Sequence, residues 1–193
     1  MSKTIKYTVE FLTDWHCGSG LSSGDDLDLL VIKDKDHLPF IPGKTIKGLI
    51  REAVEEIAGY SKEVTEEQIL AAFGHKDKKN LKSEEIKKGD CFFKNATLKD
   101  DLRIAIESNK LQEHLYRSVA STAIDNDGIA IEHSLRKMEV VVPCMLEGEI
   151  LDVPENFEEI IEKGLKFIKR LGQNRNRGLG RCVITIEKEG GKK

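Results

Sequence analysis

The stretch LPFIPGKTIKGLIRE, residues 38–52, decides the fold, because a tight bend leads there directly into an amphipathic helix. Pro42 and Gly43 predict the bend. Thr45 is expected to cap the helix with its side chain. The apolar residues then recur at helical spacing, at Ile46, Leu49, Ile50, Ala53, Val54 and Ile57. Lysines and an arginine flank that stripe, so the start of the helix is basic.

The segments around this helix alternate between strand and helix patterns. IKYTVEFL, residues 5–12, alternates apolar and polar side chains and predicts a half-buried strand. LDLLVIK (27–33) and DCFFKNATL (90–98) predict two short strands, and TEEQILAAFG (65–74) a short helix. MEVVVPCMLEGEIL (138–151) predicts a long strand or a strand pair broken near Pro143.

The C-terminal part predicts one more helix and one more strand. PENFEEIIEKGLKFIKRLG, residues 154–172, has the clearest helical periodicity. Asn156 and Glu159 resemble a capping box at its start, and Gly172 suits its end. RCVITIEKE, residues 181–189, then alternates as a final strand.

Reduced to its principal elements, the chain reads strand, helix, strand, strand, helix, strand. This order predicts an α+β fold with a ferredoxin-like core, over a single domain at 1–193 with insertions at about 59–90 and 100–137. The RNA-recognition motif shares this RRM-like topology and can carry RNA on its open sheet. Because its aromatic stacking signature is absent here, RNA contacts would use backbone amides, basic side chains and loops.

Charge is unevenly distributed along the chain. The formal net charge is −3, yet residues 163–181 contain seven basic residues and no acid. Acids are instead concentrated in segments such as EEIAGYSKEVTEEQ and PENFEEIIE. Such a bipolar surface can bind a polyanion on one side, and the alternative is a set of solvated helix faces.

Other sequence features limit the class of protein. No apolar run has the length needed to cross a bilayer, and the N-terminus lacks a secretory pattern, so we expect a cytoplasmic protein without a membrane partner. Cys17, Cys91, Cys144 and Cys182 are scattered without a Cys-x-x-Cys pair. They are expected to be buried hydrophobic residues rather than a zinc site or disulfides.

Three short constellations could carry chemistry. NRNRGLGRC, residues 174–182, joins glycines that expose amides to arginines that suit phosphate, although a tight loop with solvated arginines is the alternative. His16 in HCGSG, residues 16–20, could be a general base or a hydrogen-bonded turn histidine. The acids Asp25, Asp26 and Asp28 could bind a divalent cation, assist a ribose hydroxyl or keep an edge strand soluble.

Four motifs together resemble the RAMP superfamily of CRISPR-associated proteins. LPFIPGKTIKGLIRE is similar to its PyIPGSSLKGxLR signature, and HCGSG is similar to its His-x-Gly-x-Gly turn after the first strand. NRNRGLGRCVITI resembles its C-terminal glycine-rich loop. AIDNDGIAIEHSLRKMEVVVPC, residues 123–144, resembles a segment of the backbone subunits of type III effector complexes. The four matches occur in the expected order.

The resemblance implies a RAMP-type ferredoxin-like domain and a backbone subunit of a type III effector complex. Its partners would be guide RNA, target RNA, other CRISPR effector subunits and copies of itself in a filament. The resemblance also implies an endoribonuclease that cuts target RNA through attack of a 2′-OH, with Mg²⁺ or Mn²⁺ as cofactor.

The resemblance places the functional residues as well. Aligning DLLVIKD with the family pattern DNPVIRD makes Asp28 the catalytic and metal-binding residue, with Asp26 as the fallback. RNA-binding residues are expected in three segments: His16 and Gly18; Gly43, Lys44, Thr45, Lys47 and Arg51; and Arg175, Arg177, Gly178, Gly180 and Arg181.

The chain also departs from the family pattern. Lys44-Thr45 replaces Ser-Ser, Asn126 replaces an arginine, and Leu30 replaces a proline. The chain is short for the group, so a reduced β-hairpin thumb is expected. Two alternatives remain open, namely a non-catalytic RAMP scaffold that binds RNA, and a stand-alone endoribonuclease that processes guide precursors with His16.

Overall fold

The structure is a computed structural model that describes residues 2–22, 27–61, 64–76 and 86–187. Its centre is an antiparallel sheet built on β1 (Ser2–Phe11), which pairs with β6 (Met145–Pro154) on one side and β7 (Cys182–Glu187) on the other. β2 (Phe92–Phe93) and β3 (Thr97–Leu98) pair with the outer edge of β6. The resulting order is that of the ferredoxin-like fold, which confirms the predicted fold class.

The alternation in β1 separates the two faces of the sheet as predicted. Ile5, Tyr7, Val9 and Phe11 are all buried beneath the helices, while the intervening side chains face outward. Gly148 on β6 lies opposite Tyr7, and a Cβ there would come within 2.4 Å of the Tyr7 ring. The tyrosine ring therefore fills the space that the glycine leaves.

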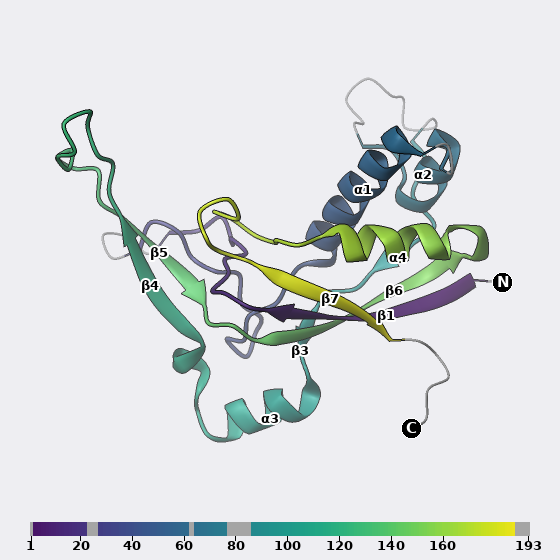
Figure 1. Cartoon of the computed structure of the whole chain (residues 1–193). Coiled ribbons are helices and arrows are strands. Elements are labelled where there is room, and N and C mark those ends of the chain that lie inside the picture. The colour runs from purple at the N-terminus through teal and green to yellow at the C-terminus, as the bar shows by residue number, and fades with distance from the viewer. Residues whose placement is uncertain (1, 23–26, 62–63, 77–85, 188–193) are drawn as a thin grey trace.

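Two helices cover one face of this sheet (Figure 1). They are α1 (Gly43–Tyr60) and α4 (Glu158–Phe167), and their apolar stripes join one core. Gly164 on α4 permits their close approach, because a Cβ there would lie 3.0 Å from Val54. Neither α1 nor α4 covers the opposite face of the sheet.

Further elements lie outside the four-strand core. α2 (Glu66–Phe73) follows α1, and a capping box between Thr65 and Gln68 fixes its start. Between β3 and β6 come α3 (Asp100–Ser108), η1 (Gln112–Leu115), β4 (Tyr116–Ser121) and β5 (Arg136–Val141). β4 and β5 pair into a hairpin that extends far from the sheet (Figure 1), so this chain has a protruding hairpin where a reduced thumb was expected.

The predicted strands differ in detail from those observed. Residues 27–33 form only isolated bridges, including Gly18 with Val31 and Leu29 with Met138, because they run between a loop and the hairpin rather than along the sheet. The strand predicted at 90–98 is divided into β2 and β3. The pair predicted at 138–151 is present as β5 and β6, separated at 142–144.

The predicted helix caps were wrong for both long helices. α1 begins at Gly43 after Pro42, so Thr45 lies inside the first turn and is not the N-cap. The Gly43 N–H donates to Asn95 Oδ1 at 2.9 Å. α4 follows η2 (Glu155–Phe157) and lacks a side-chain cap. It ends at Phe167 because buried Ile168 is extended, five residues before the predicted stop.

Gly172 has a different role from the predicted helix stop. Its φ is +98°, and a Cβ there would lie 2.4 Å from the His16 carbonyl oxygen. Only glycine allows the two chain segments to approach so closely.

The structure also bears on the cysteines and on membrane-spanning helices. All four cysteines are free, three of them buried and Cys144 partly so, as predicted. Within the described ranges, none of the helices combines the length and apolar character needed to span a membrane.

A glycine pair on α1 tests the packing of the decisive turn. A Cβ on Gly43 would lie 2.0 Å from the Phe93 carbonyl oxygen, whereas nothing lies within 4 Å of one on Gly48. We expect Gly43→Ala to lower the free energy of unfolding by about 1–3 kcal/mol through overpacking. Gly48→Ala should raise it by about 0.5–1 kcal/mol through helix propensity. Urea unfolding followed by circular dichroism measures both, and equal effects would contradict this packing.

Candidate nucleic-acid interface

The loop after β1 fastens the hairpin to the C-terminal loop. Trp15 exchanges backbone hydrogen bonds with Val141 of β5, at 3.0 and 2.8 Å. On its other side, Gly180 N–H donates to the Asp14 carbonyl at 2.7 Å and Gln173 N–H to the His16 carbonyl at 2.9 Å. These backbone bonds fix the relative position of three segments that are far apart in the sequence.

His16 is fully buried within this loop. Its Nδ1 lies 2.6 Å from the Glu139 carbonyl, which can only accept, so Nδ1 carries the proton. Its Nε2 is buried and has no hydrogen-bond partner among the described residues. A Cβ on exposed Gly18 would lie 3.1 Å from that nitrogen. His16 therefore orients the loop, and Gly18 is the member of the pair that reaches the surface.

The start of α1 lies beside the same loop. Burial raises the pKa of the Cys17 thiol, while a hydrogen bond with Thr45 and the nearby charge of Lys44 oppose the rise. Lys44 is exposed, and Thr45 and Lys47 are half-buried. Gly43 is buried with its N–H bonded to Asn95, so this amide is already occupied.

Arg51 faces away from this group. Its Nε donates to Glu55 Oε1 and its Nη1 to the Gly74 carbonyl, both at 2.7 Å. The guanidinium thus connects α1 to the end of α2. The structure does not place Arg51 with the other predicted RNA-binding residues.

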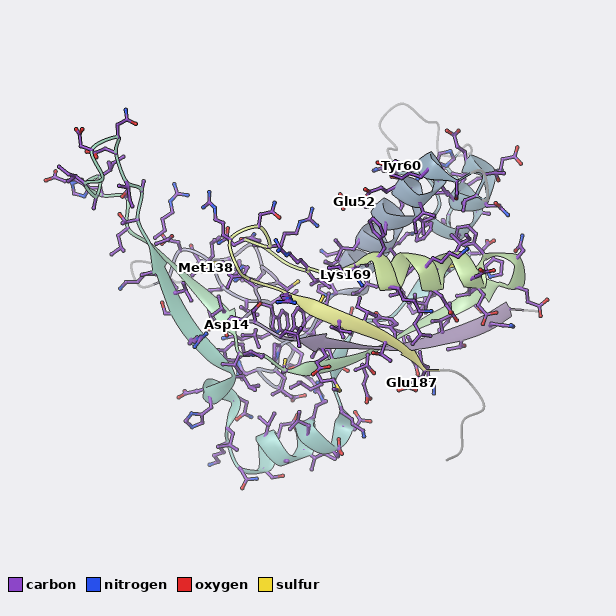
Figure 2. All side chains as sticks on the ribbon, viewed as in Figure 1. Asp14, Glu52, Tyr60, Met138, Lys169 and Glu187 are labelled. Carbon is purple, nitrogen blue, oxygen red and sulfur yellow. The ribbon has the colours of Figure 1, made fainter. Side chains whose placement is uncertain are left out.

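The basic loop, residues 170–181, is held at its base and open at its tip. Leu171 N–H donates to the Gly180 carbonyl at 2.9 Å, and a Cβ on Gly180 would lie 1.9 Å from the Leu171 carbonyl oxygen. Gly178, at φ +94°, has nothing within 4 Å of its Cβ position. Arg175, Arg177 and Arg181 are exposed. Figure 2 shows this loop between the labelled Met138 and Lys169, carrying nitrogen-tipped side chains.

Asp28 lies beside the start of β5, next to the basic loop. Its N–H donates to the Lys137 carbonyl at 2.9 Å, and its Oδ2 accepts from the Lys137 N–H at 2.7 Å. The adjacent Met138 accepts a hydrogen bond at its sulfur from Asn174 of the basic loop, at 3.2 Å. The exposed carboxylate and the arginine-bearing loop are thus linked through two consecutive residues of β5.

Glu139 joins the segments beneath this surface. Its buried carboxylate accepts from Lys33 Nζ at 2.7 Å and from the Val31 N–H at 3.1 Å. Its own N–H donates to the Leu29 carbonyl at 2.9 Å, and its carbonyl accepts from His16. One residue therefore holds the segment that carries Asp28, the first loop and the hairpin together.

The hairpin has a second attachment through Asp14. The Arg117 guanidinium on β4 donates to Asp14 Oδ2 through Nε at 2.6 Å and also through Nη2. Asp14 is buried and Arg117 is exposed, so the ion pair lies at the edge of the interface. Figure 2 shows Asp14 below Met138, where the hairpin meets the sheet.

The open face of the sheet has the opposite character. Glu10, Glu147, Glu149 and Glu187 alternate along the strands with side chains that face the helices, so they point to the other face. Two lysines, Lys6 and Lys94, lie near Glu149, with Lys94 Nζ at 2.7 Å from Oε2. This acidic face disfavours a polyanion, which leaves the loops as the surface for one.

Asp28 is the residue expected to bind a divalent metal ion. No cluster of three or more His, Cys, Asp or Glu residues capable of holding a metal ion exists among the described residues, and Asp26 lies outside them. The bond to Lys137 uses only Oδ2 of Asp28. A single carboxylate of this kind fits Mg²⁺, which commonly takes one or two protein carboxylates together with substrate phosphates.

The fold and the interface together define a ferredoxin-like protein whose basic surface is built from loops at the root of a hairpin. The chain belongs to the RAMP superfamily, whose family model matches residues 8–183. No curated protein sequence matches it.

Solved structures share the fold. A chain of the Type III-B Cmr-beta complex bound to cognate target RNA has a TM-score of 0.70 and 11% identity, covering 96% of this chain and 97% of that chain. A chain of the apo-state Type III-B Cmr-beta complex has a TM-score of 0.67 and 12% identity, covering 96% and 98%. At these sequence identities the likeness shows a shared fold and nothing more.

Sequence reasoning missed three residues that build the interface. Glu139 had a visible signal, because it is the lone acid in the apolar run MEVVV. Asn95 and Asp14 had none, since each acts on a partner more than 50 positions away.

We expect Glu139→Ala to lower the free energy of unfolding by about 2–3 kcal/mol, because Lys33 and the Val31 N–H would lose a charged acceptor. Glu139→Gln, which keeps one of the two acceptor oxygens, should cost less. Glu147→Ala on the open face is the matched control, with an effect within about 0.5 kcal/mol. Chemical denaturation measures all three, and a Glu139→Ala protein as stable as Glu147→Ala would contradict the assignment.

Proposed function

We propose that this chain binds RNA across the basic loop and the start of α1, as a backbone subunit of a type III CRISPR effector complex, and that it cuts target RNA at Asp28. The observation that carries the proposal is the link from Asp28 through Lys137 and Met138 to Asn174, which sets one exposed carboxylate beside the arginine-bearing loop. Membership of the RAMP superfamily and the fold shared with chains of Cmr-beta complexes support the proposal.

The phosphates of the guide RNA would lie on the basic loop. Arg177 and Arg181 present planar guanidinium groups that suit phosphate oxygens. Gly178 lets the RNA backbone approach the main chain, because no atom lies near its Cβ position. Lys44 and Thr45, which lie near Cys17, would extend the same surface, and Gly18 lies near Gln173 of the basic loop.

Cleavage would use the ribose next to the scissile phosphate. A 2′-OH can attack the adjacent phosphorus and expel the 5′-oxygen, provided that the backbone is bent into an in-line arrangement. The hairpin, fixed at its root by Glu139 and by Asp14, is the rigid element that could hold a target strand in this bend.

Asp28 would supply the chemical group. Its carboxylate can take the proton of the 2′-OH, or hold a divalent ion with substrate phosphates. Mg²⁺ or Mn²⁺ bound there would supply Lewis-acid stabilisation of the charge on the phosphate oxygens.

We also propose an assembly with other subunits, on the basis of the family to which the chain belongs. Other effector subunits and further copies of this chain would continue the surface along the guide. A non-catalytic RAMP scaffold is the nearest alternative, and it predicts the same RNA binding without cleavage. Precursor processing by His16 has less support, because the imidazole is buried and its Nδ1 is bonded to the Glu139 carbonyl.

The basic loop can be tested through the salt dependence of RNA binding. Arg177→Ala/Arg181→Ala should weaken binding of a single-stranded RNA about tenfold, because two charged phosphate contacts are lost. The slope of log affinity against log salt should shrink by about 1.4, since each contact to a single strand contributes about 0.7. Lys99→Ala, an exposed lysine before α3, is the control. An unchanged slope would count against the loop.

The role of Asp28 can be tested by target cleavage in the assembled complex with Mg²⁺. Asp28→Asn should reduce the cleavage rate at least about a hundredfold, because proton transfer or metal binding is lost. RNA affinity should remain unchanged, since the asparagine oxygen can still accept from the Lys137 N–H. Asp100→Asn on α3 is the control. Undiminished cutting by Asp28→Asn would reject the catalytic assignment and leave the scaffold function.

A further inference from the structure

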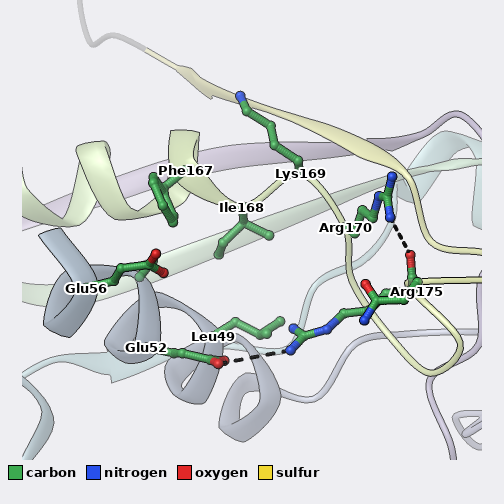
Figure 3. Close-up of a pocket in the computed structure, with 10 residues that line it drawn as sticks. Leu49, Glu52, Glu56, Phe167, Ile168, Lys169, Arg170 and Arg175 are labelled. Atoms are coloured by element: carbon green, nitrogen blue, oxygen red, sulfur yellow. Dashed lines mark hydrogen bonds and ion pairs between the residues drawn. The ribbon is translucent and has the colours of Figure 1, made fainter.

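A pocket of about 350 Å³ lies between α1 and the segment that follows α4 (Figure 3). One wall is formed by Leu49, Glu52, Ala53 and Glu56 on successive turns of α1. The other wall is the segment 167–170, with Arg175 and Asn176 of the basic loop. The volume is in the range of small-ligand sites. Because the pocket shares Arg170 and Arg175 with the basic loop, its mouth opens onto the proposed RNA surface.

The lining combines an aromatic ring with an apolar floor. Phe167 is 49% exposed although its neighbour Ile168 is buried, so the ring is presented to solvent at the pocket wall. In Figure 3 the Phe167 ring stands above Glu56, and Ile168 and Leu49 lie to one side of this pair. A flat apolar group of the size of a nucleobase could stack on this ring, and base–aromatic stacking is a common way to hold an unpaired base.

The charged groups of the pocket divide between its two walls. Both acids, Glu52 and Glu56, come from α1, one helical turn apart. The basic side chains of Lys169, Arg170 and Arg175 come from the opposite wall. Among the residues that the structure describes, Glu56 makes no ion pair, whereas Glu52 Oε1 lies 4.0 Å from Arg175 Nη2. An exposed pair at that distance is weak and exchangeable.

This arrangement selects among the nucleobases. A carboxylate accepts two parallel hydrogen bonds from two adjacent N–H groups. Only guanine offers such a pair on its Watson–Crick edge, at N1–H and the 2-amino group. Adenine and cytosine place a donor next to an acceptor there, and uracil places its single donor between two acceptors.

We propose that the pocket binds a guanine nucleotide, with the base stacked on Phe167, its Watson–Crick edge on Glu56 and its phosphate on Arg170 and Arg175. The proposal rests on the proposed RNA binding for its choice of source, which is an unpaired guanosine of the bound RNA strand. On binding, Arg175 would exchange its long contact with Glu52 for the phosphate.

The test is fluorescence anisotropy of the full chain with a labelled oligouridine RNA that carries one central guanosine. Companion RNAs carry inosine, adenosine or uridine at that position, and inosine lacks only the 2-amino group. We expect the guanosine RNA to bind about tenfold more tightly than the all-uridine RNA, and about fivefold more tightly than the inosine RNA.

Three variants assign the preference to the pocket. Phe167→Ala should reduce the affinity for the guanosine RNA about tenfold and leave the all-uridine RNA unchanged. Glu56→Gln should remove the preference for guanosine over inosine. Phe92→Ala is the matched control, because Phe92 is a comparably exposed phenylalanine on β2 that does not line the pocket. Thermal unfolding checks that each variant is folded.

The outcomes separate this inference from the proposed function. Equal binding of all four RNAs, with Arg177→Ala/Arg181→Ala still weakening them, would overturn the guanine pocket and keep the basic loop. Loss of the guanosine preference in Phe92→Ala as much as in Phe167→Ala would also overturn it. Competition with guanosine monophosphate identifies the source. Displacement of the RNA at equal concentration supports a free-nucleotide site of the same chemistry, and displacement only at large excess supports a base of the RNA strand.

Discussion

The buried carboxylate of Glu139 and its backbone are the constraint on which the interface depends. Side-chain oxygens bond to Lys33 and Val31, while main-chain atoms bond to Leu29 and His16. A buried carboxylate is stable only when its oxygens are satisfied, so the surrounding segments have little freedom to separate. One buried polar residue, Glu139, therefore positions the segments of the interface. The exposed side chains of the interface can be polar because the stability of the fold does not depend on them.

The two faces of the molecule are divided by charge, and this division explains a chain that is acidic overall yet suited to a polyanion. The open sheet carries Glu10, Glu147 and Glu187, whereas the arginines gather in a loop on the helix-covered side. The RNA-recognition motif uses its open sheet for RNA. In this chain the proposed RNA surface lies elsewhere on the same topology, where the hairpin, the first loop and the C-terminal loop meet.

Much of the fold could be predicted because local patterns and tertiary packing agree. Alternation in β1 and helical spacing in α1 each match the buried face observed. The errors arose where a residue serves a distant partner. Gly172 ended no helix because it packs on the His16 backbone, and Thr45 capped no helix because α1 begins two residues earlier, at Gly43. Motif order located the loops of the candidate site, but no local pattern could show that Arg51 turns toward α2.

The double hydrogen bond between Asp28 and Lys137 has a mechanical consequence. Both the amide and the carboxylate of Asp28 are bonded to Lys137 of β5. A tilt of the hairpin would therefore displace the Asp28 carboxylate with it. The basic loop is tied to the same strand, because Asn174 donates to the Met138 sulfur. The carboxylate and the cationic groups would therefore move together with β5, so their spacing is preserved when the hairpin tilts.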